Sequence, residues 1–180
     1  MIVLDILLAS RCSQRTRTLS VCTLCLVDQR TQQTPCLNSA IDASISLRTP
    51  TPSANIGGAF AVYSRTQNGA LGLRFHAQPA DSILNLTAQN SNAPAKVHLH
   101  PAYEGEFSIG TSNGPTDFTV IENARDPAGR GRKRRWAVVE RTAAAFKGRV
   151  WWSYTQRGDG DESKGRASVQ SYNSAVQVTV

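Results

Sequence analysis

The sequence predicts an all-β fold, a β-solenoid-like stack of strand–turn–strand repeats. Two observations lead to this prediction: a unit that recurs four times around an asparagine, and apolar residues that alternate with period two on both sides of it. The composition agrees, because only 18% of the 180 residues are charged and no helical heptad pattern competes. A β-sandwich of hairpins is the alternative, since Asn-Gly pairs also favour two-residue hairpin turns.

The repeat becomes visible when each copy is counted from its asparagine. A small residue follows the asparagine, and in the second copy the apolar residues Ala95, Val97 and Leu99 stand three, five and seven positions beyond it. Before the asparagine the apolar residues fall at even offsets, so the alternation changes phase there. Because a straight strand cannot exchange its faces, we predict a turn at each Asn–small pair, in the positive-φ conformation that Asn and Gly adopt at low cost. The predicted turn residues are Asn68, Gly69, Asn92, Asn113, Gly114 and Asn173.

Residues 1–55 carry none of the four copies, and we predict a poorly ordered N-terminal extension that ends in a Pro-containing linker. A strand over Ile41–Leu47 is the main regular element expected there. The spacing of Cys22 and Cys25 is that of a zinc knuckle, but a second close pair is missing. Ordinary reduced thiols are therefore the preferred interpretation, and no metal site is predicted. All four cysteines lie in this segment: Cys12, Cys22, Cys25 and Cys36.

The rest of the chain, residues 56–180, is predicted to form the β-repeat domain. In the second unit His98 and His100 share an outward face, and two imidazoles so spaced could bind a metal ion. No third ligand is near in the sequence, so a solvated face is preferred. Strands without the asparagine turn fill the gap between the third and fourth units, and Trp151 is the expected exposed aromatic among them. The four units cover residues 56–77, 82–100, 106–121 and 167–180.

A basic loop insertion is predicted at residues 124–135. Gly and Pro argue against regular structure there and the like charges repel each other, so the segment is expected to be exposed. Its cations could contact an anionic partner such as nucleic acid, weakly, without sequence preference and with strong salt dependence. A solvated loop with no partner is the preferred interpretation. The cations concerned are Arg130, Arg132, Lys133, Arg134 and Arg135.

Three motifs give the chain a resemblance to an uncharacterised domain family of basidiomycete fungi. They are Tyr103–Gly114, Asp126–Arg132 and Gly148–Trp152, in the order in which that family has them. The resemblance covers residues 56–180. The repeated strand–Ser-Asn-Gly–strand units are also similar, more distantly, to bacterial adhesin-head-like repeats, which implies a β-solenoid-like fold. The family has no established activity, so the resemblance assigns no functional residue.

No catalytic arrangement is recognisable in the sequence. Ser, His and an acid do not form a known nucleophile motif, and the few acids of the repeat region lie mainly in turns. We therefore expect a non-enzymatic β-repeat scaffold or interaction domain for an unknown protein partner, without a cofactor. Weak nucleic-acid binding through the Arg-rich loop is the alternative. No run suited to a membrane span and no export signal is recognised, so the cytoplasm or nucleus is the favoured compartment.

Overall fold

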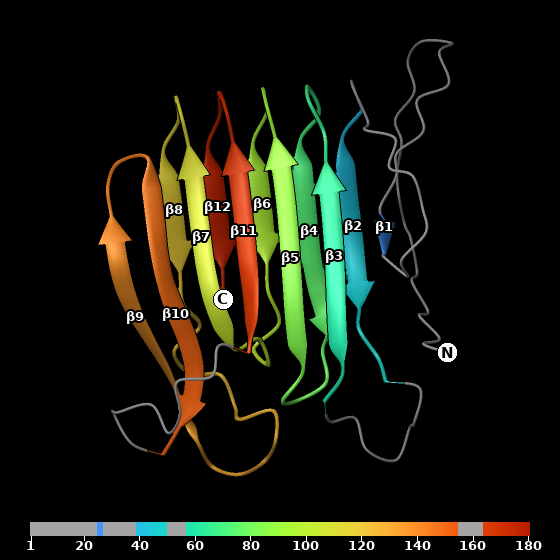
Figure 1. Ribbon diagram of the computed structural model, residues 1–180, viewed down its shortest axis with the longest axis vertical. Coiled ribbons are helices and arrows are strands. Elements are labelled where there is room, and N and C mark those ends of the chain that lie inside the picture. The colour runs from blue at the N-terminus through green and yellow to red at the C-terminus, as the bar shows by residue number, and fades with distance from the viewer. Residues whose placement is uncertain (1–24, 27–38, 50–56, 155–163) are drawn as a thin grey trace.

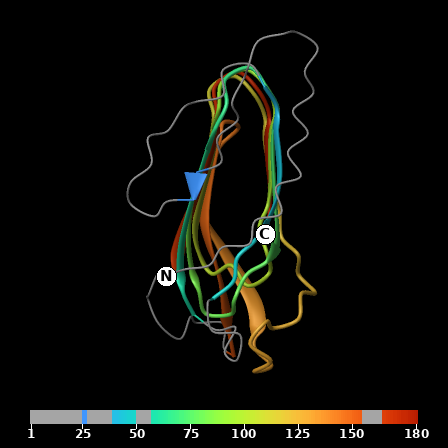
Figure 2. The same cartoon turned by 90° about the vertical axis from the view of Figure 1, so that its right-hand side faces the viewer.

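The computed structural model describes residues 25–26, 39–49, 57–154 and 164–180. In this part of the chain all regular structure is β, arranged as two open sheets that face each other (Figure 1). The prediction of an all-β fold is confirmed. Turns join the two layers at one end of the molecule (Figure 2), which we call the arch end; the opposite end is the base end. Among the described residues there is no helix of the length and apolarity that a membrane span needs.

The two sheets differ in their number of strands. The larger sheet has seven, in the order β1-β3-β5-β11-β7-β10-β9, and the smaller has five, in the order β2-β4-β6-β12-β8. The strands of the seven-stranded sheet are β1 (Cys25–Leu26), β3 (Ala59–Arg65), β5 (Ile83–Asn90), β7 (Gly105–Thr111), β9 (Lys133–Arg141), β10 (Ala145–Ser153) and β11 (Gly165–Ser171). Those of the five-stranded sheet are β2 (Ile41–Ser46), β4 (Leu71–Ala77), β6 (Ala95–His98), β8 (Thr116–Thr119) and β12 (Val176–Thr179).

Each copy of the repeat places its first strand in the larger sheet and its second strand in the smaller one. Equivalent strands of different copies then pair in parallel, as in β3 with β5 and β4 with β6. A meander of hairpins would pair consecutive strands antiparallel, so parallel pairing between equivalent strands is the mark of a solenoid-like stack. In the described part of the chain, hairpin pairing of consecutive strands is confined to β9 and β10.

The order of the copies in space differs from their order in the sequence. The last copy, β11 and β12, lies between the second and the third: β11 pairs with β5 and β7, and β12 pairs with β6 and β8. The side chains of Val176, Val178 and Val180 are completely buried as a result. The C-terminal strand thus fills the middle of the stack.

One core lies between the sheets, as the alternation predicts. The inward residues after each asparagine gather in a single cluster together with those before it. Phe118 and Val120, in the third copy, are the exceptions, because they are half-buried at the end of the stack. The predicted inward residues that the structure buries fully are Leu71, Leu73, Phe75, Val97, Leu99, Val176 and Val178.

Strand β2 belongs to the same core, so the predicted division of the chain at residue 55 separates it from its own sheet. It pairs in parallel with β4, and its residues Ile41, Ala43 and Ile45 are buried. These three residues stand three, five and seven positions after Asn38, which Ser39 follows. Asn38–Ser39 is therefore a further Asn–small pair followed by this alternation, and the count of four copies missed it. Asn38 itself, and the rest of the predicted extension apart from residues 25–26 and 39–49, lie outside the described residues.

The four predicted asparagines form one hydrogen-bonded ladder along the arches. The Nδ2 of Asn92 donates to Oδ1 of Asn68 at 2.6 Å, and Asn173 donates in the same way to Asn92 at 2.7 Å. Asn113 completes the ladder by donating to Asn173 at 2.8 Å. The ladder follows the spatial order of the copies, so it ties each arch to its neighbour.

The glycines of the arches act through close approach and not through the positive φ that we predicted. Neither Gly69 nor Gly114 has a positive φ, and among the described non-glycine residues only Asp81 does. A Cβ on Gly69 would stand 2.2 Å from the carbonyl of Ser39, and one on Gly114 would stand 2.5 Å from the carbonyl carbon of Ser174. The backbones of neighbouring arches therefore touch where these glycines lie, and the predicted φ is corrected.

Candidate functional site

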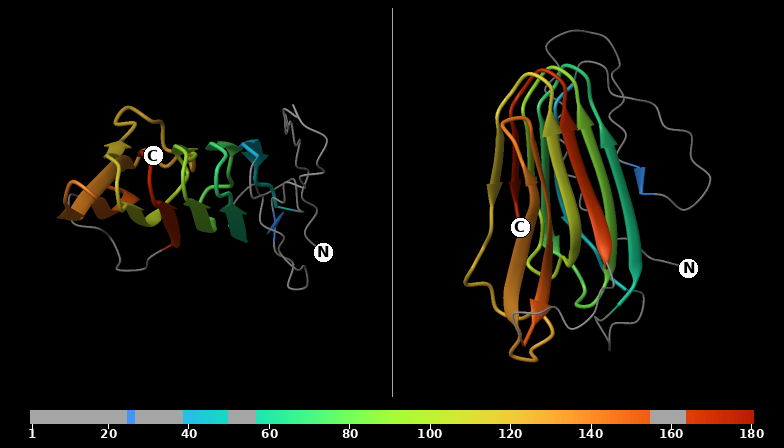
Figure 3. Two further views of the ribbon diagram at one scale, coloured as in Figure 1. Left: turned by 90° about the horizontal axis from the view of Figure 1, so that it is seen from above. Right: turned by 60° about the vertical axis from the view of Figure 1, so that its left-hand side comes forward.

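The two sheets stop at different places at one end of the stack. Beyond β7 the larger sheet continues with β10 and β9, whereas the smaller sheet ends at β8. Adjacent strands lie ~4.8 Å apart, so two additional strands overhang β8 by roughly 10 Å. Figure 3 shows the β9–β10 hairpin projecting at this end of the molecule. The overhang leaves the width of one to two strands unfilled in the smaller sheet.

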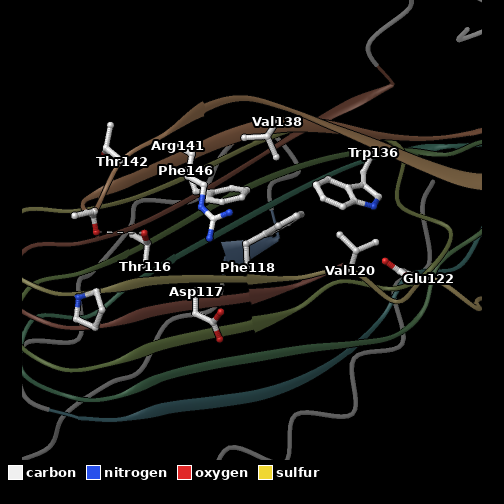
Figure 4. Close-up of a pocket in the computed structure, with 12 residues that line it drawn as sticks. Thr116, Asp117, Phe118, Val120, Glu122, Trp136, Val138, Arg141, Thr142 and Phe146 are labelled. Carbon is white, nitrogen blue, oxygen red and sulfur yellow. Dashed lines mark hydrogen bonds between the residues drawn. The ribbon is translucent and has the colours of Figure 1, made fainter. Parts of the chain in front are cut away.

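This unfilled place is a groove of about 980 Å³, which we call the end groove. One wall is β8 with the residues that follow it, and the other is the inner face of the β9–β10 hairpin (Figure 4). Its lining residues are Pro115, Thr116, Asp117, Phe118, Val120, Glu122, Trp136, Val138, Arg141, Thr142, Ala143 and Phe146.

Aromatic rings form the floor of the end groove. The ring of Phe118 stacks on Phe107 with 4.2 Å between centroids and on Phe146 at 4.9 Å. Trp136 meets Phe118 edge-on at 6.4 Å and remains 45% exposed. In the middle of the stack such rings would be covered by the next coil. Here they present an apolar surface with no further strand in the described chain over it.

The free edge of β8 offers backbone hydrogen-bonding groups to the groove. The carbonyls of Pro115 and Thr119 accept from β12, and the amide of Ile121 donates to it. Successive residues of a strand direct these groups to opposite edges, so those of Thr116, Phe118 and Val120 are directed away from β12. In the part of the chain that the structure describes, no strand pairs with this edge. The end groove thus combines an apolar floor with an unpaired strand edge.

Charged residues mark the two ends of the groove. Near the arch end, the guanidinium of Arg141 lies 5.4 Å from the centre of the Phe146 ring. At the other end, Glu122 lies beyond Val120 and Trp136 (Figure 4). Neither Arg141 nor Glu122 has an ion pair with another described residue. Asp117 also lines the groove near its arch end, but Gln177 donates to its carboxylate at 3.0 Å, and in Figure 4 that carboxylate points away from Arg141. Arg141 is therefore the cation of the arch end, and Glu122 is the anion of the opposite end.

The predicted basic loop is only partly a loop. Strand β9 begins at Lys133, and the alternation of the strand turns Arg134 inward. Arg134 is 8% exposed; it donates to the carbonyl of Pro101, and its guanidinium lies 5.4 Å from the centre of the Trp152 ring. Burial lowers the pKa of Arg134 to about 10. The prediction that the whole run is exposed is therefore wrong for Arg134, because Gly and Pro do not extend into the second half of the run.

Arg132 is the second basic residue that the structure places inside. Its guanidinium pairs with Asp126 at 3.0 Å and with Glu104 and Asp81 at 3.5 Å, and its side chain is 8% exposed. Burial alone would raise the pKa of Asp126. Hydrogen bonds from Arg132 and from the backbone outweigh burial and lower this pKa to about 2. Arg130 pairs with Asp81 at 2.8 Å but remains 47% exposed. Lys133 is exposed and Arg135 half-buried, both on β9.

These pairs belong to an ion network that joins the base ends of the coils. Lys164, just before β11, lies 3.4 Å from Asp81 and 3.3 Å from Glu104, which precede β5 and β7. The network therefore links the inserted last copy to both of its neighbours. Sequence reasoning missed it, although Lys164 and Glu104 come directly before a strand of the repeat and Asp81 comes two residues before one.

Two other features considered from the sequence are the exposure of Trp151 and a metal site. Trp151 is half-buried, and Trp136 is the exposed tryptophan. In the described ranges no three His, Cys, Asp or Glu side chains gather as metal ligands.

No family model, curated protein or solved structure matches the chain. The geometry of the molecule is therefore the basis for the function proposed for it.

Proposed function

We propose that the protein is a non-enzymatic interaction scaffold, which binds one extended polypeptide segment in the end groove as an added strand beside β8. The observation that carries this proposal is the overhang of the larger sheet, which leaves an unpaired strand edge above an aromatic floor. An exposed edge is a template for another strand, and peptide-binding domains use the same arrangement. The backbone supplies hydrogen bonds, and every second side chain enters the groove.

A single segment fits this place better than a second copy of the protein does. A further coil needs a strand in each sheet, but β10 already pairs with β7 in the larger sheet. Another stack approaching β8 would meet the hairpin first. The hairpin thus prevents end-to-end growth, which is a known hazard of open strand edges, while it leaves room for an isolated strand.

The nucleic-acid alternative has less support from the geometry. Arg132 and Arg134 are engaged inside the molecule and Arg130 pairs with Asp81 at the surface, which leaves Lys133 and Arg135 of the five predicted cations for an anionic partner. Fewer phosphate contacts mean weaker binding that salt reduces easily. The groove, in contrast, offers both a directional edge and an apolar surface.

The test is the binding of a short probe peptide with alternating Val and Thr residues and an amino-terminal fluorescein-labelled Lys, measured by fluorescence anisotropy. We expect saturable binding that Trp136→Ala weakens several-fold. Tyr172→Ala is the matched control, because Tyr172 is a 60% exposed aromatic on an arch and lies outside the groove. A probe with N-methylated backbone amides should not bind, since it cannot pair with a strand edge.

Three results would overturn the proposal. One is the absence of saturable binding at concentrations that keep the probe soluble. Another is an equal loss of binding in the Trp136 and Tyr172 variants. The third is dimerisation of the protein through the β8 edge, seen by sedimentation and insensitive to the probe, because the occupant would then be a second copy.

A further inference from the structure

We infer that the segment bound in the end groove is the C-terminus of a partner chain, whose terminal carboxylate lies beside Arg141 and is selected by this arginine. The inference rests on the proposed function and adds the chemistry of the partner. A carboxylate presents a planar pair of oxygens to a guanidinium. An Asp or Glu side chain presents the same pair, and the experiment below separates it from the C-terminus.

The arch end of the groove is bounded by the turn between β9 and β10. The hydroxyl of Thr116 donates to the carbonyl of Ala143 at 3.5 Å, which links β8 to the turn between β9 and β10. The same turn is fastened to β7, because the amide of Thr111 donates to the carbonyl of Ala144 at 2.8 Å. A strand lying along β8 must therefore end, or leave the groove, at this point.

Arg141 stands at that end with its guanidinium held over the groove. It pairs across the hairpin with Phe146, and its position 5.4 Å from the centre of that ring is a cation–π contact that keeps the charge close to the floor. In Figure 4 the guanidinium points from β9 into the space above Phe118 and Thr116. Since no other described residue forms an ion pair with Arg141, the charge is available to a ligand.

The opposite end of the groove reinforces the same polarity. Glu122 lies there, so a carboxylate would be repelled and an amine or a basic side chain favoured. A segment that ends in its own C-terminus would consequently run from Glu122 toward Arg141, antiparallel to β8. The unpaired amides and carbonyls of the β8 edge can pair with a strand that runs in this direction.

The experiment compares three forms of the Val-Thr probe: the free acid, its C-terminal amide, and an amide whose last residue is Asp. A charge-assisted pair at a partly exposed site corresponds to a loss of about tenfold in affinity when the charge is removed, so the plain amide should bind about tenfold more weakly than the acid. The Asp-ended amide is expected to bind weakly as well. If it binds as tightly as the free acid, the partner's carboxylate is a side chain, and the assignment of a C-terminus is overturned.

Arg141→Gln should bind the acid and the amide equally, and Arg141→Lys should retain part of the preference. Arg74→Gln, an exposed arginine on β4, is the matched control and should leave the preference intact. Equal binding of all three probes by the unaltered protein, or a preference that persists in Arg141→Gln, would overturn the inference and leave strand addition standing. If none of the probes binds, the proposed function itself fails.

Discussion

The third and fourth copies of the repeat share a sequence pattern but lie in different surroundings. In the fourth copy, Val176, Val178 and Val180 are completely buried, because β12 lies between β6 and β8. The equivalent residues of the third copy are Thr116, Phe118 and Val120, and all three are half-buried, because β8 has one neighbour. The repeat thus determines which side chains point inward, whereas the place in the stack determines how much water they lose. The surface that remains exposed in the third copy lines the end groove.

The largest effect is expected in the ion network at the base ends of the copies. Replacing Arg132 with Met leaves the buried carboxylate of Asp126 without its main partner and removes an ion pair from Glu104, which keeps Lys164. We expect a loss of about 3 kcal/mol in the free energy of unfolding. Arg130→Met, at the exposed neighbour, should cost less than about 1 kcal/mol. Urea unfolding measures both. Equal costs would show that the network does not hold the copies together.

The difference in burial between the third and fourth copies is tested by the same substitution in each copy. Val178→Ala removes a completely buried side chain and should cost about 2–3 kcal/mol, while Val120→Ala should cost less than about 1 kcal/mol because its site is already open to water. The midpoints of urea unfolding, at unchanged slope, give the two values. A cost at Val120 as large as that at Val178 would mean that the end of the stack is covered in solution.

The contact between the third and fourth arches is tested by adding a single methyl group. Gly114→Ala places a Cβ 2.5 Å from the carbonyl carbon of Ser174, and overpacking of this kind costs about 1–3 kcal/mol. Gly110→Ala is the matched control, since the nearest atom to its Cβ lies 4.0 Å away. A shift in melting temperature only for the Gly114 variant is expected. Unchanged melting in both would contradict the close approach of the arches.

The smallest effect is expected in the asparagine ladder. Asn173→Ala removes a side chain that donates to Asn92 and accepts from Asn113, while Asn113→Ala removes one ladder bond. Each exposed bond contributes at most about 1 kcal/mol, so the variant of the fourth copy should be the less stable by a fraction of that. Thermal unfolding in parallel resolves the difference. The reverse order would place Asn113, and not Asn173, inside the ladder.

Sequence patterns could predict the strands and arches of this protein but not their order in space. Alternation around Asn68, Asn92, Asn113 and Asn173 identifies inward side chains, because that property depends on local periodicity. Every copy carries the same pattern, so any spatial order of the copies satisfies it. The contacts specific to the observed order come from groups outside the pattern, such as Lys164 with its partners before β5 and β7.

The end groove could not be predicted for a related reason. It arises because the β9–β10 hairpin takes the place of a further coil in one sheet and leaves the other sheet unextended. Phe118, Trp136 and Arg141 each have an ordinary place in the sequence, and only tertiary pairing brings them together. The composition instead favoured the Arg-rich run as an exposed contact site. Strand alternation already implied, however, that one of Arg134 and Arg135 would face inward.

The most direct test of strand addition is amide hydrogen exchange of the protein with and without the probe peptide, followed residue by residue by NMR. An added strand should slow exchange at Thr116, Phe118 and Val120, whose amides are directed to the groove. Exchange at Asp117 and Thr119, whose amides are directed toward β12, should change little. This every-second-residue protection is the predicted result. Uniform protection along β8, or protection at another strand edge, would contradict binding of the segment as the next strand of the smaller sheet.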